Sequence, residues 1–402
     1  MNSWPSTKAR VPNWSAKTSF DEAVQTLAEH TAARVPKRQL EELVQKAAQD
    51  FDAFYADRQA AVPGEPRAEA SNELIVLTAD GKGVVMHHDD LREVTRAAAE
   101  ADVDRASLGD QITSTDKKHR KRMATVAAVY TVQPHVRTPE QVFCEIARDP
   151  CEPQSIKPLP RPRPQNKRVW ASLEHEPADV IAEAFREASS RDVARTQKWV
   201  AVVDGNEHQL DLIELCAQRQ AVPITVVLDI FHVLGYVWHA TRALEEGDAK
   251  LTQARVLDRM RSILQGEAVS VAAGLRRSAT RRNLTKAQRK PVDEGANYLL
   301  KYREYLKYHE YLAAGFPIGS GVVEGACRHL VKDRMAITGA RWRLRSAEAV
   351  LRIRALRSSG DFDEYWKFHE ASELQRNHAA KYFERHIPAL STAQSPQPRP
   401  GA

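Results

Sequence analysis

The sequence predicts an α/β protein with a mixed sheet, an N-terminal helical region and a long helical segment in its second half. Two continuous apolar runs, 199–203 and 224–228, are separated by a helix-forming stretch, and this pattern indicates a parallel βαβ unit buried on both faces. Almost everything after Phe231 has helical periodicity. With 402 residues, 42% of them hydrophobic, the chain has enough apolar material for two or three domains and is not a disordered protein.

Composition excludes several classes of protein. The four cysteines form no CxxC pair, which argues against a zinc ribbon, an iron–sulfur cluster or a disulfide scaffold. No apolar stretch reaches about 18 residues, so we expect no membrane span, and the basic N-terminus lacks the apolar core of a secretory signal. The expected location is the cytoplasm. The net charge of +6 is small, so its distribution along the chain matters more than its sum.

The first third of the chain predicts helices followed by short strands. Residues 1–66 form the predicted N-terminal helical region, which a Pro- and Gly-rich break ends. Apolar runs on both sides of Asp80-Gly81 predict a hairpin with Asp80 at the end of its first strand. The basic run 117–122 is interpreted as a charged face, and the following residues 123–132 predict a third strand.

The remaining boundaries follow from composition. A Pro-rich connector is predicted at 149–168, inside a core spanning 72–232 that contains the two buried strands. Residues 233–315 predict an all-helical insertion, too long for a simple connector. Residues 316–385 predict the C-terminal part of the core with basic helices, and 386–402 a disordered tail.

Three acids stand out by their position. Asp80 ends the first predicted strand, Asp204 ends the first buried parallel strand, and Glu324 lies in the first turn of a helix after a Gly-rich break. Three meandering strands followed by two parallel strands and a helix are the order of elements in an RNase H-like fold. In that fold, strands 1 and 4 are neighbours and the acids at their ends converge. Asp229, which ends the next buried strand, is the rival for the second position.

Such a trio of carboxylates suits two Mg²⁺ or Mn²⁺ ions, because these hard cations take oxygen ligands and keep several waters. Two metals can activate a water or a 3′-hydroxyl and stabilise the leaving oxygen of a phosphoryl transfer. Each acid also has an ordinary interpretation: Asp80-Gly81 and Asp204-Gly205 are common turn dipeptides, and Glu324 is favoured near a helix N-terminus by the helix dipole.

Two blocks carry a resemblance to a known family. Residues 198–238 (KWVAVVDGNEHQLDLIELCAQRQAVPITVVLDIFHVLGYVW) resemble the core of ISKra4-family insertion-sequence transposases, which are similar to ISL3-like and Mutator-like DDE enzymes. Residues 315–342 (GFPIGSGVVEGACRHLVKDRMAITGARW) resemble the family's segment with the catalytic Glu, and 345–369 its C-terminal block. The family often carries an N-terminal Cys-rich zinc module, and this sequence departs from that pattern, since its first cysteine is Cys144.

The resemblance implies a DNA transposase with a DDE triad of Asp80, Asp204 and Glu324 that binds two Mg²⁺ or Mn²⁺ ions. It implies metal-dependent cleavage at insertion-sequence ends and strand transfer into target DNA, by a homodimer or larger synaptic complex near the bacterial nucleoid. Two alternatives stay open: an RNase H-like metal-dependent nuclease without strand transfer, and a catalytically inactive DNA-binding remnant of a transposase.

Basic residues gather directly after Glu324. Residues 328–357 hold nine basic and two acidic residues, a net charge of +7 that exceeds the charge of the whole chain. Arg328 and Lys332 follow Glu324 at helical spacing, and such a stripe is typical of phosphate binding. Trp342 is either a stacking platform for an unpaired base or a core residue. The predicted DNA contacts are Arg328, Lys332, Arg334, Arg341, Trp342, Arg343 and Arg345.

Three further groups of residues each have two interpretations. Residues 276–290 hold seven basic residues and no acid, and they form either a second DNA-binding patch or a solvated loop. His232 is interpreted as an orienting residue at a strand end in preference to a metal ligand. The cluster His87-His88-Asp89-Asp90 is interpreted as a solvated surface in preference to a metal site.

Overall fold

The computed structural model describes residues 7–31, 34–60, 72–103, 120–147, 161–245 and 248–379. Several predicted features fall wholly or partly outside these ranges. They are residues 1–6 and the Pro- and Gly-rich break at 61–66 of the N-terminal region, residues 117–119 of the basic run, residues 149–160 of the Pro-rich connector, and the disordered tail 386–402. Within the described ranges, no helix is both long enough and apolar enough to cross a membrane.

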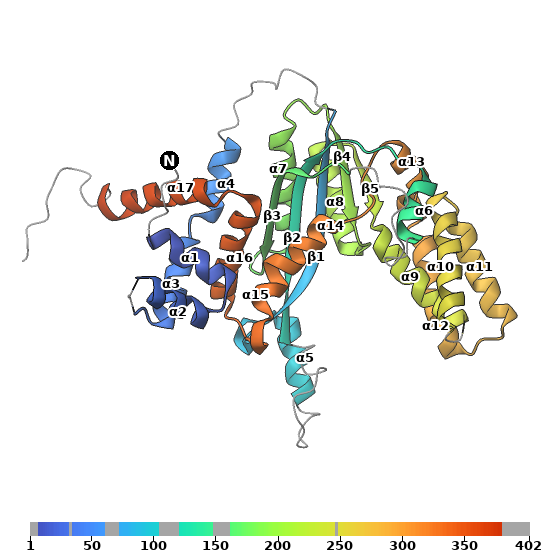
Figure 1. Ribbon diagram of the computed structural model, residues 1–402, viewed down its shortest axis with the longest axis horizontal. Helices are drawn as coiled ribbons and strands as arrows, with labels where there is room; N and C mark the ends of the chain where they lie inside the picture. Colours follow the sequence, from blue (N-terminus) through green and yellow to red (C-terminus); the bar gives the residue numbers. More distant parts are fainter. Residues whose placement is uncertain are drawn as a thin grey trace, which may run out of the picture.

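A mixed five-stranded sheet forms the centre of the molecule, with helices on both of its flanks (Figure 1). The strand order is β3-β2-β1-β4-β5, in which β1, β2 and β3 form an antiparallel meander and β4 and β5 run parallel to β1. The prediction that the first strand lies beside the fourth is confirmed. The strands are β1 (Leu74–Val85), β2 (Lys121–Val132), β3 (Gln165–Ser172), β4 (Lys198–Val203) and β5 (Ile224–Leu228).

The predicted hairpin around Asp80-Gly81 is wrong, because β1 continues through that dipeptide as one strand of 12 residues. β2 is equally long and pairs with β1 at every position, including Asp80 with Val126. A continuous partner strand therefore overrides the local turn preference. The side chain of Met123 on β2 comes close to Gly81, where a Cβ atom would lie 3.1 Å from its Cε.

β3 was missed by the sequence analysis. It begins at Gln165, directly after Pro164, within the connector predicted at 149–168. Its first two residues are polar and exposed, the third is half-buried, and the remaining five are buried. The antiparallel meander of three strands therefore exists, but its members are β1, β2 and β3 and not the two arms of a hairpin with a third strand.

Helices at the two ends of the chain pack together beside β3. Helix α16 contacts β3, α1 and α3. Asp361 accepts hydrogen bonds from Tyr55 Oη at 2.8 Å and from Arg58 at 2.7 Å, and this joins the start of α17 to α4. The helices of this group are α1 (Thr7–Lys17), α2 (Phe20–Thr31), α3 (Lys37–Ala47), α4 (Phe51–Ala60), α16 (Leu344–Ser359) and α17 (Phe362–Leu374).

On the opposite side of the sheet the chain is helical from Ile230 onward (Figure 1). Helix α9 packs on α12, and Gly295 of α12 allows this approach because a Cβ atom there would lie 3.0 Å from Ala240 Cβ. The helices of this group are α9 (Ile230–Leu244), α10 (Ala249–Leu264), α11 (Ala268–Arg281), α12 (Lys286–Lys301) and α13 (Tyr308–Ala313).

The chain then returns to the sheet. Helix α14 (Gly321–Ala326) contacts β1, β2 and β3, and a π-helix (Cys327–Lys332) and the short α15 (Asp333–Met335) continue it. The remaining helices are α5 (Glu93–Val103), α6 (Pro139–Ala147), α7 (Pro177–Arg191), which contacts β1 and β2, and α8 (Glu207–Gln220), which connects β4 to β5.

Candidate functional site

The register of the parallel strands sets three aspartates at one level. β1 pairs with β4 up to Thr78 opposite Val202, and β4 pairs with β5 up to Val203 opposite Leu228. Continued to the next residues, this register places Asp80 level with Asp204, and Asp204 level with Asp229. The acids therefore mark the end of the parallel half of the sheet, although Asp80 lies within its own longer strand.

Asp80 is half-buried and has a partner for each carboxylate oxygen. Its Oδ1 accepts the backbone N–H of Gly81 at 2.6 Å, and its Oδ2 accepts the thiol of Cys327 at 3.2 Å. Burial, and next the negative charge of Asp80, raise the pKa of Cys327 well above its usual range. The thiol therefore stays protonated and acts as a hydrogen-bond donor to Asp80.

Asp204 lies in a tightly fixed loop with its carboxylate only half-buried. Its Oδ1 accepts the backbone N–H of Asn206 at 2.9 Å. Two tyrosines of α12 and its C-terminal end hold the loop from behind: Tyr298 Oη donates to the Asp204 carbonyl at 3.0 Å, and Tyr302 Oη to the Gly205 carbonyl at 2.7 Å. Gly205 has a φ of +92°, which an L side chain rarely adopts.

Asp229 has a different environment, because its side chain is completely buried and accepts four hydrogen bonds. As the N-cap of α9, its Oδ1 accepts the backbone N–H groups of Phe231 at 2.6 Å and His232 at 3.2 Å. Its Oδ2 accepts the backbone N–H of Ser320 at 2.5 Å and the Ser320 hydroxyl. Asp229 thus connects α9 to the segment that leads into α14.

Glu324 lies in α14 with an exposed side chain, and its N–H bonds the Ser320 carbonyl at 3.1 Å. Partial burial, followed by the negative charges of Asp229 and Asp80, raises the pKa of Glu324, while His232 opposes this shift. The negative charges of both Asp229 and Asp80 therefore act on Glu324 in this structure. Sequence reasoning paired Asp80 with Glu324 although Glu324 lies 244 positions after Asp80.

The donor chemistry of the three predicted ligands fits Mg²⁺, since all are carboxylates and Asp204 and Glu324 are accessible to solvent. Their arrangement in this structure is more open than a metal-bound cluster. Within the described ranges, no three His, Cys, Asp or Glu side chains lie close enough together to hold one ion. One oxygen of Asp80 would have to exchange its Cys327 donor for a cation.

Five of the seven predicted DNA contacts are exposed, and two need correction. The exposed side chains are Arg328, Lys332, Arg341, Arg343 and Arg345. Arg334 is only 2% exposed and Trp342 only 5%, so neither side chain can contact DNA in this structure. Their burial has a common cause, because the Arg334 guanidinium lies 4.9 Å from the Phe20 ring centroid and 4.8 Å from that of Trp342.

Both corrected residues have structural partners. Arg334 Nε donates to the Ser15 carbonyl at 3.1 Å, and burial lowers the pKa of Arg334 to about 10. Trp342 Nε1 donates to the Met335 carbonyl at 3.1 Å, and its backbone forms a bridge with Met86. The two alternatives for Trp342 are thereby resolved in favour of the core.

Several of the basic side chains in 328–357 already have partners within the protein, so fewer of them are available to DNA than their number indicates. Arg354 donates to three backbone carbonyls, and Arg352 pairs with Asp52 at 3.0 Å and with Glu348 at 3.6 Å. Arg343 lies 3.1 Å from Asp89 and 3.3 Å from Asp90. The cluster at 87–90 is therefore partly neutralised by Arg343.

Arg328 and Lys332 follow Glu324 in a π-helix and not in the α-helix that the spacing predicted. A π turn contains more residues than an α turn, so their positions relative to Glu324 are shifted around the helix axis. Both remain exposed, and Arg328 lies 3.9 Å from Asp333.

Residues 276–290 span the end of α11 and the start of α12, so they are largely helical and not a long loop. Several of their charges have partners inside this group of helices. Arg282 pairs with Glu245 at 2.9 Å, Arg289 with Asp293 at 3.2 Å, and Lys290 with Glu294 at 3.8 Å. These ion pairs reduce the positive charge that the run presents to an anion.

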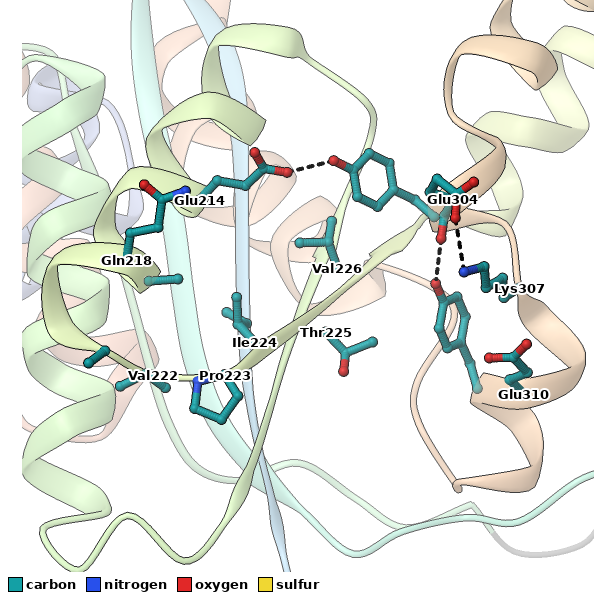
Figure 2. A pocket seen from close by; sticks show the side chains of 14 residues that line it. Glu214, Gln218, Val222, Pro223, Ile224, Thr225, Val226, Glu304, Lys307 and Glu310 are labelled. Atoms are coloured by element: carbon teal, nitrogen blue, oxygen red, sulfur yellow. Dashed lines mark hydrogen bonds and ion pairs between the residues drawn. The ribbon is translucent and has the colours of Figure 1, made fainter.

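Two pockets flank the two ends of β5. The first lies between the C-terminal end of α8, the exposed edge of β5 and residues 304–311, with Glu214, Glu304, Glu310 and Lys307 around it (Figure 2). None of the candidate carboxylates lines it. The second, about 300 Å³, lies on α9 and includes Glu324 in its wall. Sequence reasoning missed this second pocket, although it singled out His232, which lines it.

Comparisons with known proteins leave the family open. No protein-family model matches the chain, and no curated protein matches it. Among solved structures, the strand transfer complex of the Drosophila P element transposase aligns with 94% of this chain and 82% of that chain, at 12% sequence identity and a TM-score of 0.28. At that TM-score the similarity carries no argument about fold or function.

Proposed function

We propose that this chain is a DDE-type DNA transposase with an RNase H-like core, in which Asp80, Asp204 and Glu324 bind two Mg²⁺ or Mn²⁺ ions. The observation that carries the proposal is the common level of Asp80, within β1, and Asp204, directly after the neighbouring parallel strand β4, together with the action of the Asp229 and Asp80 charges on Glu324. A bound cation would relieve the repulsion by which nearby negative charges raise the pKa of Glu324.

The two bound ions would supply activation of a water or a DNA 3′-hydroxyl and stabilisation of the leaving oxygen. The chain's own residues would position these reactants. The tyrosines of α12 fix the loop that carries Asp204, and Asp229 fixes the segment that precedes Glu324. The exposed Arg328 and Lys332, next to Glu324 in the chain, are placed to bind DNA phosphates.

Asp204 is preferred over Asp229 as the second ligand for a physical reason. Both oxygens of Asp229 already accept two donors each in a fully buried setting, so ligation of a cation would break several hydrogen bonds. Asp204 is half-buried, and its carboxylate accepts a hydrogen bond from the backbone N–H of Asn206. Recognition of transposon ends and assembly as a homodimer are further parts of the proposal.

The test is strand cleavage and joining on labelled DNA that carries the flanking element ends, with Mg²⁺ or Mn²⁺. Wild type is compared with Asp204→Asn, Asp229→Asn and Glu324→Gln. We expect wild type to cut and join, and Asp204→Asn and Glu324→Gln to be inactive. Cleavage without joining would favour a nuclease on the same fold, and DNA binding without any cleavage would favour an inactive remnant.

The Asp229→Asn variant separates two structural interpretations. Retained activity in this variant, with Asp204→Asn inactive, would support the assigned triad. Activity in Asp204→Asn with none in a correctly folded Asp229→Asn protein would overturn it, and Asp229 would then take the second position. Circular dichroism and thermal unfolding of each variant show whether it is folded.

A further inference from the structure

Helix α9 carries exposed aromatic side chains, and two of them line a pocket together with Glu324. Phe231 is 56% exposed and Tyr236 40% exposed. Both line the pocket of about 300 Å³ on this helix. The complete lining consists of Phe231, His232, Gly235, Tyr236, His239 and Glu324.

The two aromatic rings are supported from behind. Tyr236 stacks on Tyr298, with ring centroids 3.9 Å apart and an angle of 15° between the planes. Phe231 packs against the backbone of Gly319, where a Cβ atom would lie 3.3 Å from the ring. Each ring therefore stays in place although much of its surface faces solvent, and this rigidity lowers the entropic cost of binding a flat ligand.

Gly235 forms an open position in the middle of the same helix. Glycine is unfavourable there relative to alanine because it increases the backbone freedom of the unfolded chain. Helix packing does not explain it: a Cβ atom at Gly235 would have no neighbour within 4 Å, whereas one at Gly295 would press on Ala240. The missing side chain leaves room between Phe231 and His239, one turn before and one turn after.

We propose that this pocket receives an unpaired nucleobase of the DNA substrate, stacked on the rings of Phe231 and Tyr236. This inference rests on the proposed function, since Glu324 lines the same pocket and would connect the base to the site of phosphoryl transfer. Aromatic side chains stack on bases of any sequence, because every base has a π-face. The imidazoles of His232 and His239 offer hydrogen-bonding groups to the base edge.

The position of the phosphate-binding candidates favours DNA as the source of the base. Arg328 and Lys332 are exposed and lie four and eight positions after Glu324 in the chain. The π-helix that carries them continues α14, which contributes Glu324 to the pocket, so a strand whose phosphates contact these residues would run beside that helix. This assignment replaces Trp342, which was the stacking candidate in the sequence and is buried in the structure.

The test measures binding of the full chain to a labelled single-stranded oligonucleotide and to one of equal length with several central abasic positions. Fluorescence anisotropy in EDTA makes the readout independent of cleavage. We expect the intact strand to bind roughly 5- to 100-fold more tightly than the abasic strand, the range for one stacked base. Gly235→Leu, which fills the pocket, is expected to remove this difference.

Gly274→Leu is the matched control. Gly274 also lies within a helix, α11, and a Cβ atom there likewise has no neighbour within 4 Å. This variant should bind both oligonucleotides as wild type does. Phe231→Ala is a second pocket variant that adds no bulk, and it should reduce the preference for the intact strand.

Each result has a defined meaning. Equal affinity of wild type for intact and abasic strands, or an unchanged preference in folded Gly235→Leu and Phe231→Ala proteins, would overturn the stacking site and leave the proposed function standing. Failure of wild type to bind any DNA would overturn both. Thermal unfolding of every variant confirms that a lost preference does not reflect a lost fold.

Discussion

The ends of β4 and β5 look alike in sequence and differ in structure. Each strand is a continuous apolar run followed directly by an aspartate and then by a helix. Asp204 remains half-buried in a loop held by tyrosines, whereas Asp229 is fully buried and accepts four hydrogen bonds. The comparison teaches that a strand-ending carboxylate becomes a structural anchor or an available ligand according to the donors that the rest of the fold brings to it.

The largest expected effect is on stability at the end of β5. Asp229→Ala leaves the donors of Phe231, His232 and Ser320 without their acceptor in a buried position, and we expect a loss of about 3 kcal/mol or more in the free energy of unfolding. Urea denaturation measures this loss. Asp204→Ala is the matched comparison and should cost less than about 1 kcal/mol. Equal losses in the two variants would contradict the contrast.

The next effect concerns Mg²⁺ and follows from the proposed function. A ligand that binds only the folded chain stabilises it by about 2.7 kcal/mol at a hundredfold excess over its Kd. Wild type should therefore unfold at a higher temperature in saturating Mg²⁺ than in EDTA, and Asp204→Asn should lose most of this increase. If Asp204→Asn keeps the full increase while a folded Asp229→Asn protein loses it, the roles of the two acids are reversed.

Ser320→Ala tests the connection between Asp229 and the segment before α14 with a smaller change than Asp229→Ala. Ser320 is 3% exposed, and its hydroxyl donates to the same oxygen of Asp229 as its backbone N–H. The variant removes one of the four donors, and we expect a loss of about 1–2 kcal/mol in chemical denaturation. A loss below about 0.5 kcal/mol would show that the backbone donors alone hold this carboxylate.

The smallest effect is the pH dependence of Glu324. Its folded-state pKa is raised, so the folded protein binds a proton more tightly than the unfolded chain does. In metal-free buffer the contribution of Glu324 to stability should therefore fall as pH rises from the unfolded pKa through the folded one. Because Glu324 is exposed, the change is only a few tenths of a kcal/mol.

Glu324→Gln removes this titration. Above the folded pKa the variant should be slightly more stable than wild type in urea, and below the unfolded pKa the two should be equal. A wild-type advantage at neutral pH without metal would mean that the charges of Asp80 and Asp229 do not act on Glu324 as the structure indicates.

The two edges of the sheet, β3 on one side and β4 with β5 on the other, also show how far the sequence could predict the structure. β4 and β5 were found because buried parallel strands have continuous apolar runs, and their terminal acids could then be located. β3 was missed because it follows a proline and begins with exposed polar residues. The unbroken course of β1 through Asp80 depends on its long partner β2, which no local pattern at Asp80-Gly81 reveals.

For the site itself, sequence identified the acids but not their environments. The anchoring of Asp229 depends on Ser320, which lies 91 positions later, and the burial of Arg334 depends on a helix at the start of the chain. A count of basic residues does not distinguish Arg334 from Arg328. Only the tertiary contacts do, and for this reason two of the seven proposed DNA contacts had to be reassigned to the core.

The π-helix at Cys327–Lys332 has a consequence for how this segment tolerates change in length. An α-helix turns by roughly 100° per residue, so the wider π turn adjusts the angular phase between the residues before it and after it. Here it allows Glu324 to face solvent and Cys327 to reach Asp80 while Arg334 faces the core. Deletion of a single residue within 327–332 would restore a regular helix, and this would rotate either the residues before the π turn or those after it away from their partners. We therefore expect insertions and deletions in this segment to destabilise the protein far more than substitutions of its exposed side chains.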